Sequence, residues 1–501
     1  MGRLNVLTSP QERLRSLGAA VTIGTDRVGS AQGAVDALLT DAARFGVSAR
    51  AGWRPPTLSG RLAECPPDDR PLAPGPAAAT LLRLLADPDA ALIEEWAQLA
   101  VRRGVVVDAA AAPLVLDWWA RQPRRSEAVF AALGRRGEWL ASLNASWHKP
   151  IATGEVPADA DDLWQLSKSA ERLALLISVR RREPARARAL IESTWLNDGA
   201  NDRQRFLEVL RENASMADEP FLESALDDRS KLVRRQAADV LAVVSGSRLR
   251  QRMSEAAKAI VLVRAPRSLP GRSLTRIVLQ PPDSFVASWE RDGLEERPPE
   301  GIGQRAWWMR QILARADLDV WTSLAGMTPE AILESLKSDD YFGDAVQALI
   351  AAANATSDAR WSAALVRCLL DQRAIDLASV AALLEALPDR EREVLSLEII
   401  KRAPLTVVDR WALLGSLDEP WSALFSTEAT KALSAEASPG VQDPARLSRA
   451  IENVSRRISP DALDGFEQAV ARSFSGTPPP GALFSIERAR LRGYMHKEFT
   501  S

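Results

Sequence analysis

The sequence contains very little histidine or cysteine: 2 His and 2 Cys among 501 residues. Zinc sites need several Cys or His ligands, disulfide frameworks need paired Cys, and most acid–base catalysis uses His. The sequence also lacks a phosphate-binding loop of the Gly-Lys-Ser/Thr kind, a dinucleotide-binding fingerprint and a nucleophile elbow. We therefore expect no metal site, no cofactor and no catalytic residues, and a non-enzymatic role is favoured over an enzymatic one.

Charge of one sign and long apolar runs are also lacking. The 64 Lys and Arg residues nearly balance the 66 Asp and Glu residues, for a formal charge of −2, which argues against binding to nucleic acid or anionic membranes by bulk charge. The longest apolar stretch, residues 105–120, is interrupted by Asp108, Pro113 and Asp117. A membrane-spanning helix needs about 20 apolar residues. The first residues do not resemble a signal peptide, so we expect a cytoplasmic protein without a membrane segment.

Apolar residues at helical spacing are abundant. Leu92, Ile93, Trp96, Leu99 and Ala100 would form one stripe on a helix. Further stripes occupy residues 109–121, 127–143, 162–182, 185–196, 202–212, 219–226 and 231–244. Many of the short connections carry an acidic or hydroxyl residue followed by Pro, which is typical of a helix start. The pattern predicts an all-α fold, specifically a HEAT-like α-solenoid of antiparallel helix pairs.

Interruptions of this pattern divide the chain into four predicted segments. Residues 1–76 are expected to form a helical segment and a Pro-rich connector, and residues 77–260 the first HEAT-like repeats. Residues 261–300 are expected to form a small irregular or β insertion, with a short strand at 274–279 and a hairpin partner at 286–289. Residues 301–501 are expected to form the C-terminal helical repeats.

The most specific repeat signal lies at residues 221–244. A helix that ends in Leu226 is followed by an Asp turn and by a second helix in which Ala and Leu lie four and eight residues after Val233. We expect Asp228 to cap the second helix and Arg234 to reach the turn of a neighbouring repeat. The predicted buried stripe of that helix consists of Val233, Ala237, Val240, Leu241 and Val244.

Several short segments resemble an uncharacterised bacterial family of unknown function with HEAT-like helices. They are residues 23–27 (IGTDR), 92–96 (LIEEW), 133–140 (LGRRGEWL), 169–173 (SAERL), 218–223 (DEPFLE), 291–293 (RDG) and 301–308 (GIGQRAWW). Members of that family are often encoded beside a MoxR-type AAA ATPase, a von Willebrand factor A protein and a SWIM zinc-finger protein. The resemblance implies a partner role in such an assembly, and it supplies no catalytic residues.

Arginines and tryptophans supply the candidate binding surface. The arginine clusters fit either a solvated face with ion pairs or a concave basic groove for phosphate or an acidic partner. Adjacent residues on a helix point about 100° apart, so one member of each Trp pair, at 118–119 and 307–308, is expected outside the main core stripe. It would be buried against the next repeat or exposed as a partner contact. The candidate residues are Arg180, Arg181, Arg182, Arg186, Arg188, Arg234, Arg235, Trp307 and Trp308.

Two functions fit these observations. The first is a scaffold or adaptor that binds protein partners, including an AAA ATPase or a von Willebrand factor A protein, on its concave face. The second is a nucleic-acid-binding protein or base-acting enzyme that uses a groove lined by Arg and Trp. A continuous positive stripe on that face would favour nucleic acid, whereas a face of mixed charge would favour protein.

Overall fold

A computed structural model describes most of the chain from residue 64 onward. The described residues are 43, 47, 64–122, 126–147, 156, 159–264, 276–371, 376–417, 421–435, 443–474 and 476–499. The chain divides into two units, Met1–Cys65 and Pro66–Ser501. Everything below concerns the second unit, so the helical segment expected near the N-terminus lies outside the described residues.

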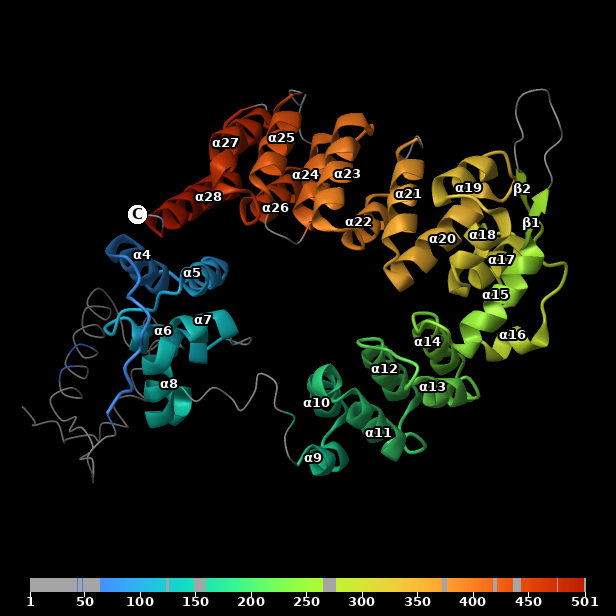
Figure 1. Cartoon of the computed structure of the whole chain (residues 1–501), viewed down its shortest axis with the longest axis horizontal. Coiled ribbons are helices and arrows are strands. Elements are labelled where there is room, and N and C mark those ends of the chain that lie inside the picture. Colours follow the sequence, from blue (N-terminus) through green and yellow to red (C-terminus); the bar gives the residue numbers. More distant parts are fainter. Residues whose placement is uncertain are drawn as a thin grey trace, which may run out of the picture. The chain divides into compact units, whose positions relative to one another are not determined.

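The second unit is built from helices, which confirms the predicted all-α class. Helices make up 70% of the structure, and the described residues contain 25 α-helices and one two-stranded sheet. The first helices, which Figure 1 labels, are α4 (Gly75–Ala86), α5 (Ala90–Arg103), α6 (Ala112–Ala120), α7 (Glu127–Ala132), α8 (Gly134–Leu143) and the 3-10 helix η1 (Ala145–Trp147). They are followed by α9 (Ala160–Leu166), α10 (Ser169–Arg182), α11 (Pro184–Thr194), α12 (Ala200–Leu210), α13 (Glu219–Ala225), α14 (Lys231–Leu241) and α15 (Arg248–Ile260).

The remaining elements start with the sheet and run to the C-terminus. The strands are β1 (Val261–Arg264) and β2 (Arg276–Leu279). The helices are α16 (Ala287–Arg291), α17 (Gln304–Arg315), α18 (Asp319–Ala325), α19 (Pro329–Leu336), α20 (Phe342–Thr356), α21 (Ala359–Leu370), α22 (Leu377–Glu385), α23 (Asp389–Arg402), α24 (Val407–Ser416), α25 (Ala423–Ser434), α26 (Pro444–Ser455), η2 (Pro460–Ala462), α27 (Leu463–Arg472) and α28 (Pro480–Glu498).

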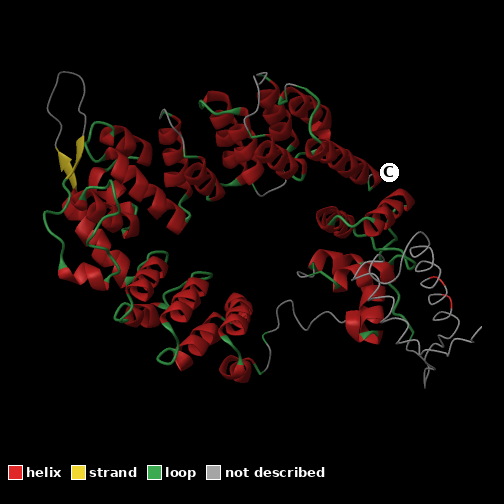
Figure 2. Cartoon of the chain, turned by 180° about the vertical axis from the view of Figure 1, so that it is seen from behind, coloured by secondary structure: helices red, strands yellow, loops and turns green. Residues whose placement is uncertain are grey.

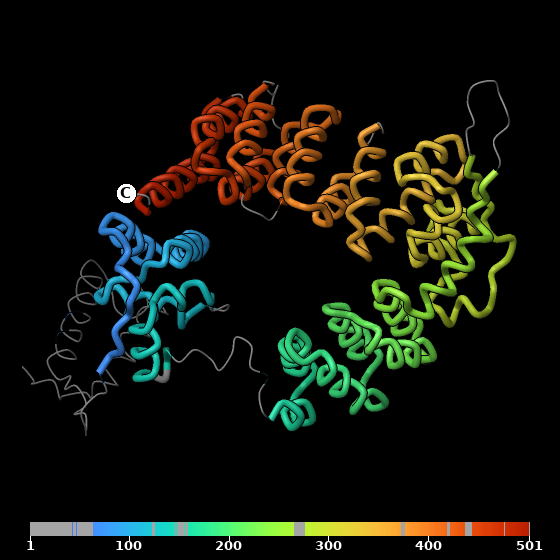
Figure 3. The backbone as a smooth tube through the Cα atoms, in the orientation of Figure 1, coloured from blue at the N-terminus to red at the C-terminus, as the bar shows by residue number. Residues whose placement is uncertain are grey.

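Helices that are two positions apart in the chain pack against each other, as the backbone trace in Figure 3 lets the reader follow. Helix α12 contacts both α10 and α14, and α26 contacts both α24 and α28. Helix α17 packs against α20, three positions on, and is linked to α14 by the ion pair of Arg315 with Asp239. We call α10, α12, α14, α17, α20, α22, α24, α26 and α28 the first row. The intervening helices α19, α21, α23, α25 and α27 also contact one another in order and form a second row. Neighbouring helices within each row are thus separated in the chain by at least one other helix.

Tryptophan fills much of the apolar interior. Trp96 and Trp119 belong to a core formed by α4–α8, to which Met495 and Phe499 from the C-terminal end also contribute. A second core extends from Ala160 to Ala489. Its fully buried tryptophans are Trp164, Trp321, Trp361 and Trp411. Each buried ring removes roughly 150–250 Å² from water, which makes these residues the main anchors between helices.

The helix starts only partly follow the expected acid–Pro or hydroxyl–Pro pattern. Thr328 and Asp443 accept hydrogen bonds from backbone N–H groups in the first turns of α19 and α26, as predicted. Helix α5 is instead capped by Asp89, one residue after the predicted Asp87–Pro88 pair. The capping residue thus lies two positions after Asp87, because Pro88 precedes the cap and is not part of the helix.

The sheet differs from the expected hairpin. Strand β2 confirms the predicted strand, but it pairs antiparallel with β1 and not with residues 286–289. Most of that expected partner lies in helix α16, so the prediction was wrong. Figure 2 shows the two strands in yellow. The free edge of β2 is covered because Ile277 N–H donates to Ser335 Oγ (3.0 Å) and Leu279 N–H donates to Asp339 Oδ2 (3.0 Å).

The predicted repeat at residues 221–244 has the expected buried stripe but different polar contacts. All five residues of that stripe are at most 1% exposed. Asp228 accepts from Ser230 N–H (2.8 Å), just before α14, and forms no capping bond to the helix itself. Arg234 donates to the carbonyl of Asp228 (2.9 Å), in the turn of its own repeat. The turn that Arg234 contacts is therefore the turn of its own repeat and not that of a neighbouring repeat. Outside the repeat, Arg234 pairs with Glu290.

Cys368 is a buried free thiol. Among the described residues, none of the helices is both long and apolar enough to cross a membrane.

Candidate functional site

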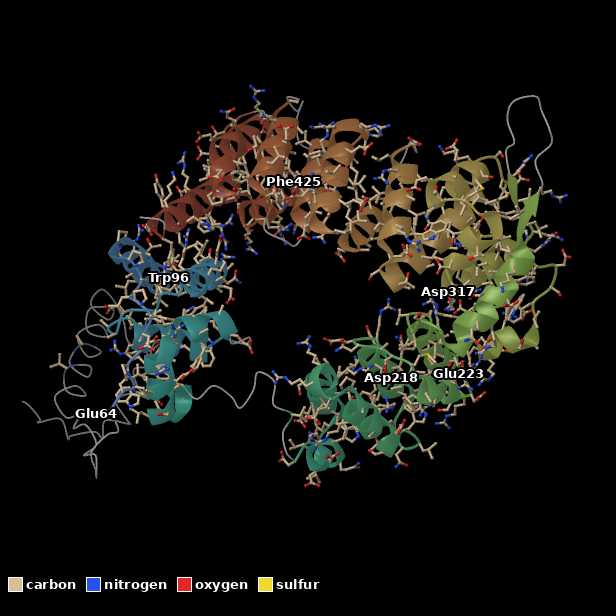
Figure 4. The ribbon with its side chains drawn as sticks, in the orientation of Figure 1. Glu64, Trp96, Asp218, Glu223, Asp317 and Phe425 are labelled. Atoms are coloured by element: carbon tan, nitrogen blue, oxygen red, sulfur yellow. The ribbon has the colours of Figure 1, made fainter. Side chains whose placement is uncertain are left out.

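The predicted arginine cluster around residue 180 divides into an interior part and a surface part. Arg180 is fully buried, and its guanidinium donates to both carboxylate oxygens of Asp218 at 3.0 and 2.8 Å (Figure 4 labels Asp218). It also donates to backbone carbonyls of Pro184, Leu210, Glu212 and Asn213. Three of these carbonyls lie at the C-terminal end of α12, where the helix dipole is negative. Arg180 therefore joins α10 to α12 and is not a partner-binding residue.

Asp218 is the carboxylate at the centre of this interior cluster. It accepts from Arg180 and also from Arg188 Nη1 (2.9 Å) and Ser215 N–H (3.0 Å). Burial raises the pKa of Asp218, but the hydrogen bonds and charge of Arg180, together with Ser215 and Arg188, lower it more strongly. The pKa consequently lies below its ordinary value of 3.8. Asp218 thus stays ionised, and its negative charge pairs with two of the predicted site arginines, Arg180 and Arg188.

Arg181 and Arg186 of this cluster form ion pairs near the surface. Arg181 pairs with Glu212 (3.0 Å) while its side chain is 64% exposed. Arg186 pairs with Asp161 and with Glu183. Arg182 is exposed on the last turn of α10. This arrangement corresponds to the solvated face with ion pairs that the sequence left open as one alternative.

Arg234 and Arg235 lie on α14 beside the segment that follows the sheet. Arg235 Nη1 donates to Glu295 Oε1 (3.1 Å), and Arg234 faces Glu290. The turn after α16 approaches α14 so closely that a Cβ on Gly293 would lie 2.9 Å from the Cβ of Ala238. Because Gly293 also has a φ of +77°, this contact requires glycine. The two arginines therefore help to hold the segment after the sheet against α14.

The Trp pair at 307–308 divides as the helix geometry predicts. Trp308 is buried, its ring packs near Phe285, and its Nε1 donates to the carbonyl of Glu296 (2.8 Å). Trp307 is half-buried on another face of α17, and its buried Nε1 has no hydrogen-bond partner among the described residues. The pair at 118–119 behaves in the same way, with Trp119 buried and Trp118 half-buried.

Trp307 and Arg235 meet in a groove of about 580 Å³ formed by four helices of the first row. We call it the α12–α20 groove. Helix α12 contributes Glu208, α14 contributes Arg235 and Asp239, and α17 contributes Trp307, Arg310 and Arg315. Helix α20 contributes mainly small and amide side chains, Gln347, Ala351 and Asn354 among them. Small residues on α20 leave the space that makes the groove, since larger ones would fill it.

Three arginines of this groove have carboxylate partners. Arg315 Nη2 donates to Asp239 Oδ1 (2.7 Å), which links α17 to α14. Arg310 lies 3.7 Å from Asp344, and Arg235 pairs with Glu295. The groove is therefore not a continuous positive stripe, because three of its arginines have a carboxylate partner.

The groove also contains two donors and one acceptor that are buried and unpartnered among the described residues. The donors are Trp307 Nε1 and Arg315 Nε, and the acceptor is Asn354 Oδ1. Buried polar groups in proteins are nearly always hydrogen-bonded, and leaving one unpaired costs about 1–3 kcal/mol. Sequence reasoning found Trp307 through the adjacent Trp pair, but it missed Asn354 and Arg310. No sequence signal connects α20 to α14, because their contact depends on how the helices stack.

Asp227, Asp228 and Asp339, which belong to consecutive Asp–Asp pairs in the sequence, are engaged by arginine or backbone groups. Asp227 pairs with Arg291, and Asp228 accepts from Arg203 Nη2 (3.1 Å). Asp339 accepts from backbone N–H groups of Leu279 and Tyr341. Within the described part of the chain, no cluster of three or more His, Cys, Asp or Glu residues is arranged to hold a metal ion.

Comparison with known families gives one match. The model of a family of unknown function, DUF5691, matches residues 10–499. The chain belongs to this family. The DUF5691 match spans the whole described part of the chain, including both the α12–α20 groove and the C-terminal helix α28. No curated protein matches the chain, and no solved structure matches it either.

Proposed function

We propose that this DUF5691 chain is a non-enzymatic scaffold of the HEAT-like type. The contacts between helices two positions apart, and the buried stripe of the repeat at residues 221–244, support an α-solenoid of stacked helix pairs. In such an architecture the first row of helices lines the concave face. The α12–α20 groove would then lie on the face that solenoids use to bind their partners.

The observation that carries this proposal is the set of three unpartnered groups in the groove. Trp307 Nε1 and Arg315 Nε need acceptors, and Asn354 Oδ1 needs a donor. A peptide backbone offers both, as C=O and N–H groups. The mixed charges of the groove wall suit a polypeptide that carries both signs. The occupant is therefore an extended segment of a protein partner.

The resemblance described above suggests which proteins supply that segment. We propose a MoxR-type AAA ATPase or a von Willebrand factor A protein as the partner. The alternative from the sequence, a nucleic acid, is disfavoured by the carboxylates paired with Arg235, Arg310 and Arg315, which lower the positive potential that phosphate binding requires.

The test is affinity purification of the full chain from native cells in mild salt with nucleotide present, followed by mass spectrometry. The blocking variant is Ala351→Arg, because Ala351 is exposed on α20 and lines the groove. The control is Ala185→Arg, which places the same side chain at an exposed position of α11. We expect the wild type and the control to recover one of the two named partners, and recovery with Ala351→Arg to fall by about tenfold or more.

Two results would contradict the proposal. Equal recovery of partner by wild type and Ala351→Arg would remove the groove from the interaction. Binding of DNA or RNA at about 50 mM salt that weakens steeply as salt is added would favour the nucleic-acid function instead.

A further inference from the structure

The C-terminal helix α28 packs against the first helices of the same unit, about four hundred residues away in sequence. Arg492 donates to both carboxylate oxygens of Glu95 on α5, at 2.7 and 2.8 Å. Arg488 Nη2 donates to Asp89 Oδ1 (2.7 Å), the residue that caps α5. The rings of Phe499 and Trp96 lie 5.3 Å apart. Charged and apolar contacts thus hold α28 against α5.

A cavity of about 880 Å³ lies where α5, α26 and α28 meet. Its wall contains three carboxylates, from Glu94, Glu95 and Asp461, and seven cationic side chains. The cationic residues are Lys497 and the arginines Arg102, Arg103, Arg456, Arg457, Arg488 and Arg492. The wall therefore has more cationic than anionic groups, although Arg488 pairs with Asp89 and Arg456 with Glu452 beside it.

The Glu95 carboxylate in the cavity wall is occupied by contacts within the protein. Glu95 accepts from Arg492 on both oxygens and lies 2.7 Å from His496 Nε2. Burial raises the pKa of Glu95, but the hydrogen bonds and charges of His496 and Arg492 lower it more strongly, to about 2. Glu95 therefore neutralises Arg492 and is not available to the other cationic groups of the wall.

Two of these cationic groups, Arg102 and Arg103, have no carboxylate partner among the described residues. Arg102 and Arg103 are exposed in the last turn of α5, and neither forms an ion pair or side-chain hydrogen bond within the described residues. Like charges held close together repel each other unless an anion lies between them. A bound anion would relieve that repulsion.

Two buried N–H donors of the same cavity wall also lack acceptors. Arg488 and Trp421 are each only 7% exposed. Arg488 Nε and Trp421 Nε1 are buried and have no hydrogen-bond partner among the described residues. Burial lowers the pKa of the Arg488 guanidinium, an effect that the charge of Asp89 opposes. The cavity thus has an excess of donors as well as of positive charge, and it lacks acceptor oxygens.

We propose that this cavity binds a small molecule that carries two or more linked phosphate groups. Phosphate oxygens are acceptors only, and guanidinium groups bind them with paired hydrogen bonds. The volume lies within the range of roughly 300–1,000 Å³ that small-molecule sites occupy. Leu99, Ile458 and the ring of Trp421 add an apolar wall, which suits a ligand that carries an organic group beside its phosphates.

A bound phosphate ligand would also fasten α28 to α5. Arg102 and Arg103 belong to α5, Arg456 follows α26, and Arg488 belongs to α28. A ligand that contacts all of them bridges helices from both ends of the unit. Such a ligand should therefore stabilise the contact between α28 and α5 in proportion to its affinity.

The experiment is calorimetric titration of the full chain with inorganic tripolyphosphate and, separately, with adenosine triphosphate, at constant ionic strength. Sulfate serves as the reference anion, because nonspecific attraction acts on any anion of similar charge. We expect tripolyphosphate to bind with a dissociation constant below about 1 mM and sulfate not to bind measurably. Tighter binding of adenosine triphosphate than of tripolyphosphate would show that the apolar wall contacts the organic group. Equal binding of the two would show that the site recognises the phosphates alone.

Three variants complete the test. Arg102→Glu/Arg103→Glu reverses two exposed, unpaired charges and should weaken tripolyphosphate binding about tenfold or more. Trp421→Phe keeps the ring but removes the unpartnered N–H, and should weaken binding about threefold. Arg390→Glu, an exposed position of α23 outside the cavity wall, is the control and should leave the affinity unchanged.

The proposal would be overturned by any of three results. One is the absence of tripolyphosphate binding to the wild type at millimolar concentration. Another is unchanged affinity in both Arg102→Glu/Arg103→Glu and Trp421→Phe. The third is equal weakening by Arg390→Glu, because it would show that the anion responds only to net charge.

Discussion

Two buried arginines, Arg180 and Arg488, are held in different ways. Arg180 donates from all three nitrogens, to Asp218 and to four backbone carbonyls. Arg488 donates to Asp89 alone, and its buried Nε has no partner within the described residues. The first guanidinium is saturated and the second is not. A buried arginine whose N–H groups all have acceptors stabilises the interior. A buried arginine that lacks an acceptor for one N–H group remains available to a ligand.

The saturated arrangement recurs in this protein. Arg492 donates to the carbonyls of Ser455 and Ile458 at the C-terminal end of α26, and Arg392 donates to the carbonyls of Leu384 and Leu387 at the C-terminal end of α22. In each case an arginine from another helix satisfies the free carbonyls at a helix end, as Arg180 does for α12. Many arginines of this sequence therefore belong to the contacts between helices and not to a binding surface.

The largest effect is expected at Arg180. Arg180→Met should lower the free energy of unfolding by about 3–5 kcal/mol, because it removes one partner of a buried ion pair and leaves Asp218 and several carbonyls unsatisfied. Arg188 remains on Asp218 and limits the loss. Urea unfolding followed by circular dichroism measures the change. A loss below about 1 kcal/mol would contradict the view that Arg180 is a saturated interior group.

The second prediction concerns pH and the contact of α28 with α5. The folded pKa of Glu95, about 2, lies below the unfolded value of 4.5. Its stabilising effect is therefore fully present above pH 4.5 and is lost as pH falls toward 2; the difference corresponds to about 3 kcal/mol. The stability difference between wild type and Glu95→Gln should shrink as pH falls from about 5 to about 2.5. Urea unfolding at each pH tests this, and a difference that does not change with pH would contradict it.

A smaller effect is expected at Arg488. Arg488→Met should lower the free energy of unfolding by only about 1 kcal/mol, because it removes one ion pair with a partly exposed carboxylate and at the same time removes an unsatisfied donor. The same urea titration that is used for Arg180→Met gives the comparison directly. A loss as large as that at Arg180 would show that Arg488 has interior acceptors after all.

The smallest effect is expected at Arg181, the exposed neighbour of Arg180. Arg181 and Glu212 form an ion pair with side chains that are 64% and 43% exposed. Arg181→Ala should change the free energy of unfolding by at most about 0.5 kcal/mol, since water and salt screen such pairs. This variant is the matched control for Arg180→Met, and a large loss would mean that position 181 is not a simple surface ion pair.

The sequence predicted local features well and the sites poorly. The helical class, the strand ending at Leu279, the stripe on α14 and the division of both Trp pairs follow from local periodicity, because each depends on one element. The pairing of β2 with β1 was missed, since the apolar run at residues 261–264 continues directly from α15 and gives no strand signal of its own. Local pattern therefore predicts elements better than their partners.

The candidate sites depend on contacts that no local pattern contains. Arg180 was predicted as a surface residue because it lies within an arginine run, but the carbonyls at the end of α12 bury it. Arg488 and Arg492 recur at a spacing of four on α28, which places them on one helix face. The sequence could reveal that face but not the α5 residues opposite, which lie near residue 100. Only the three-dimensional arrangement brings the two sets together.

The most direct test of this distinction is one measurement on two variants. Arg180→Met and Arg488→Met are compared with wild type for tripolyphosphate affinity by calorimetry, at a temperature where all three remain folded by circular dichroism. We expect Arg180→Met to bind tripolyphosphate with the affinity of the wild type and Arg488→Met to bind it about fivefold more weakly or worse. Equal affinity of Arg488→Met and wild type, or an equal loss in both variants, would contradict this expectation.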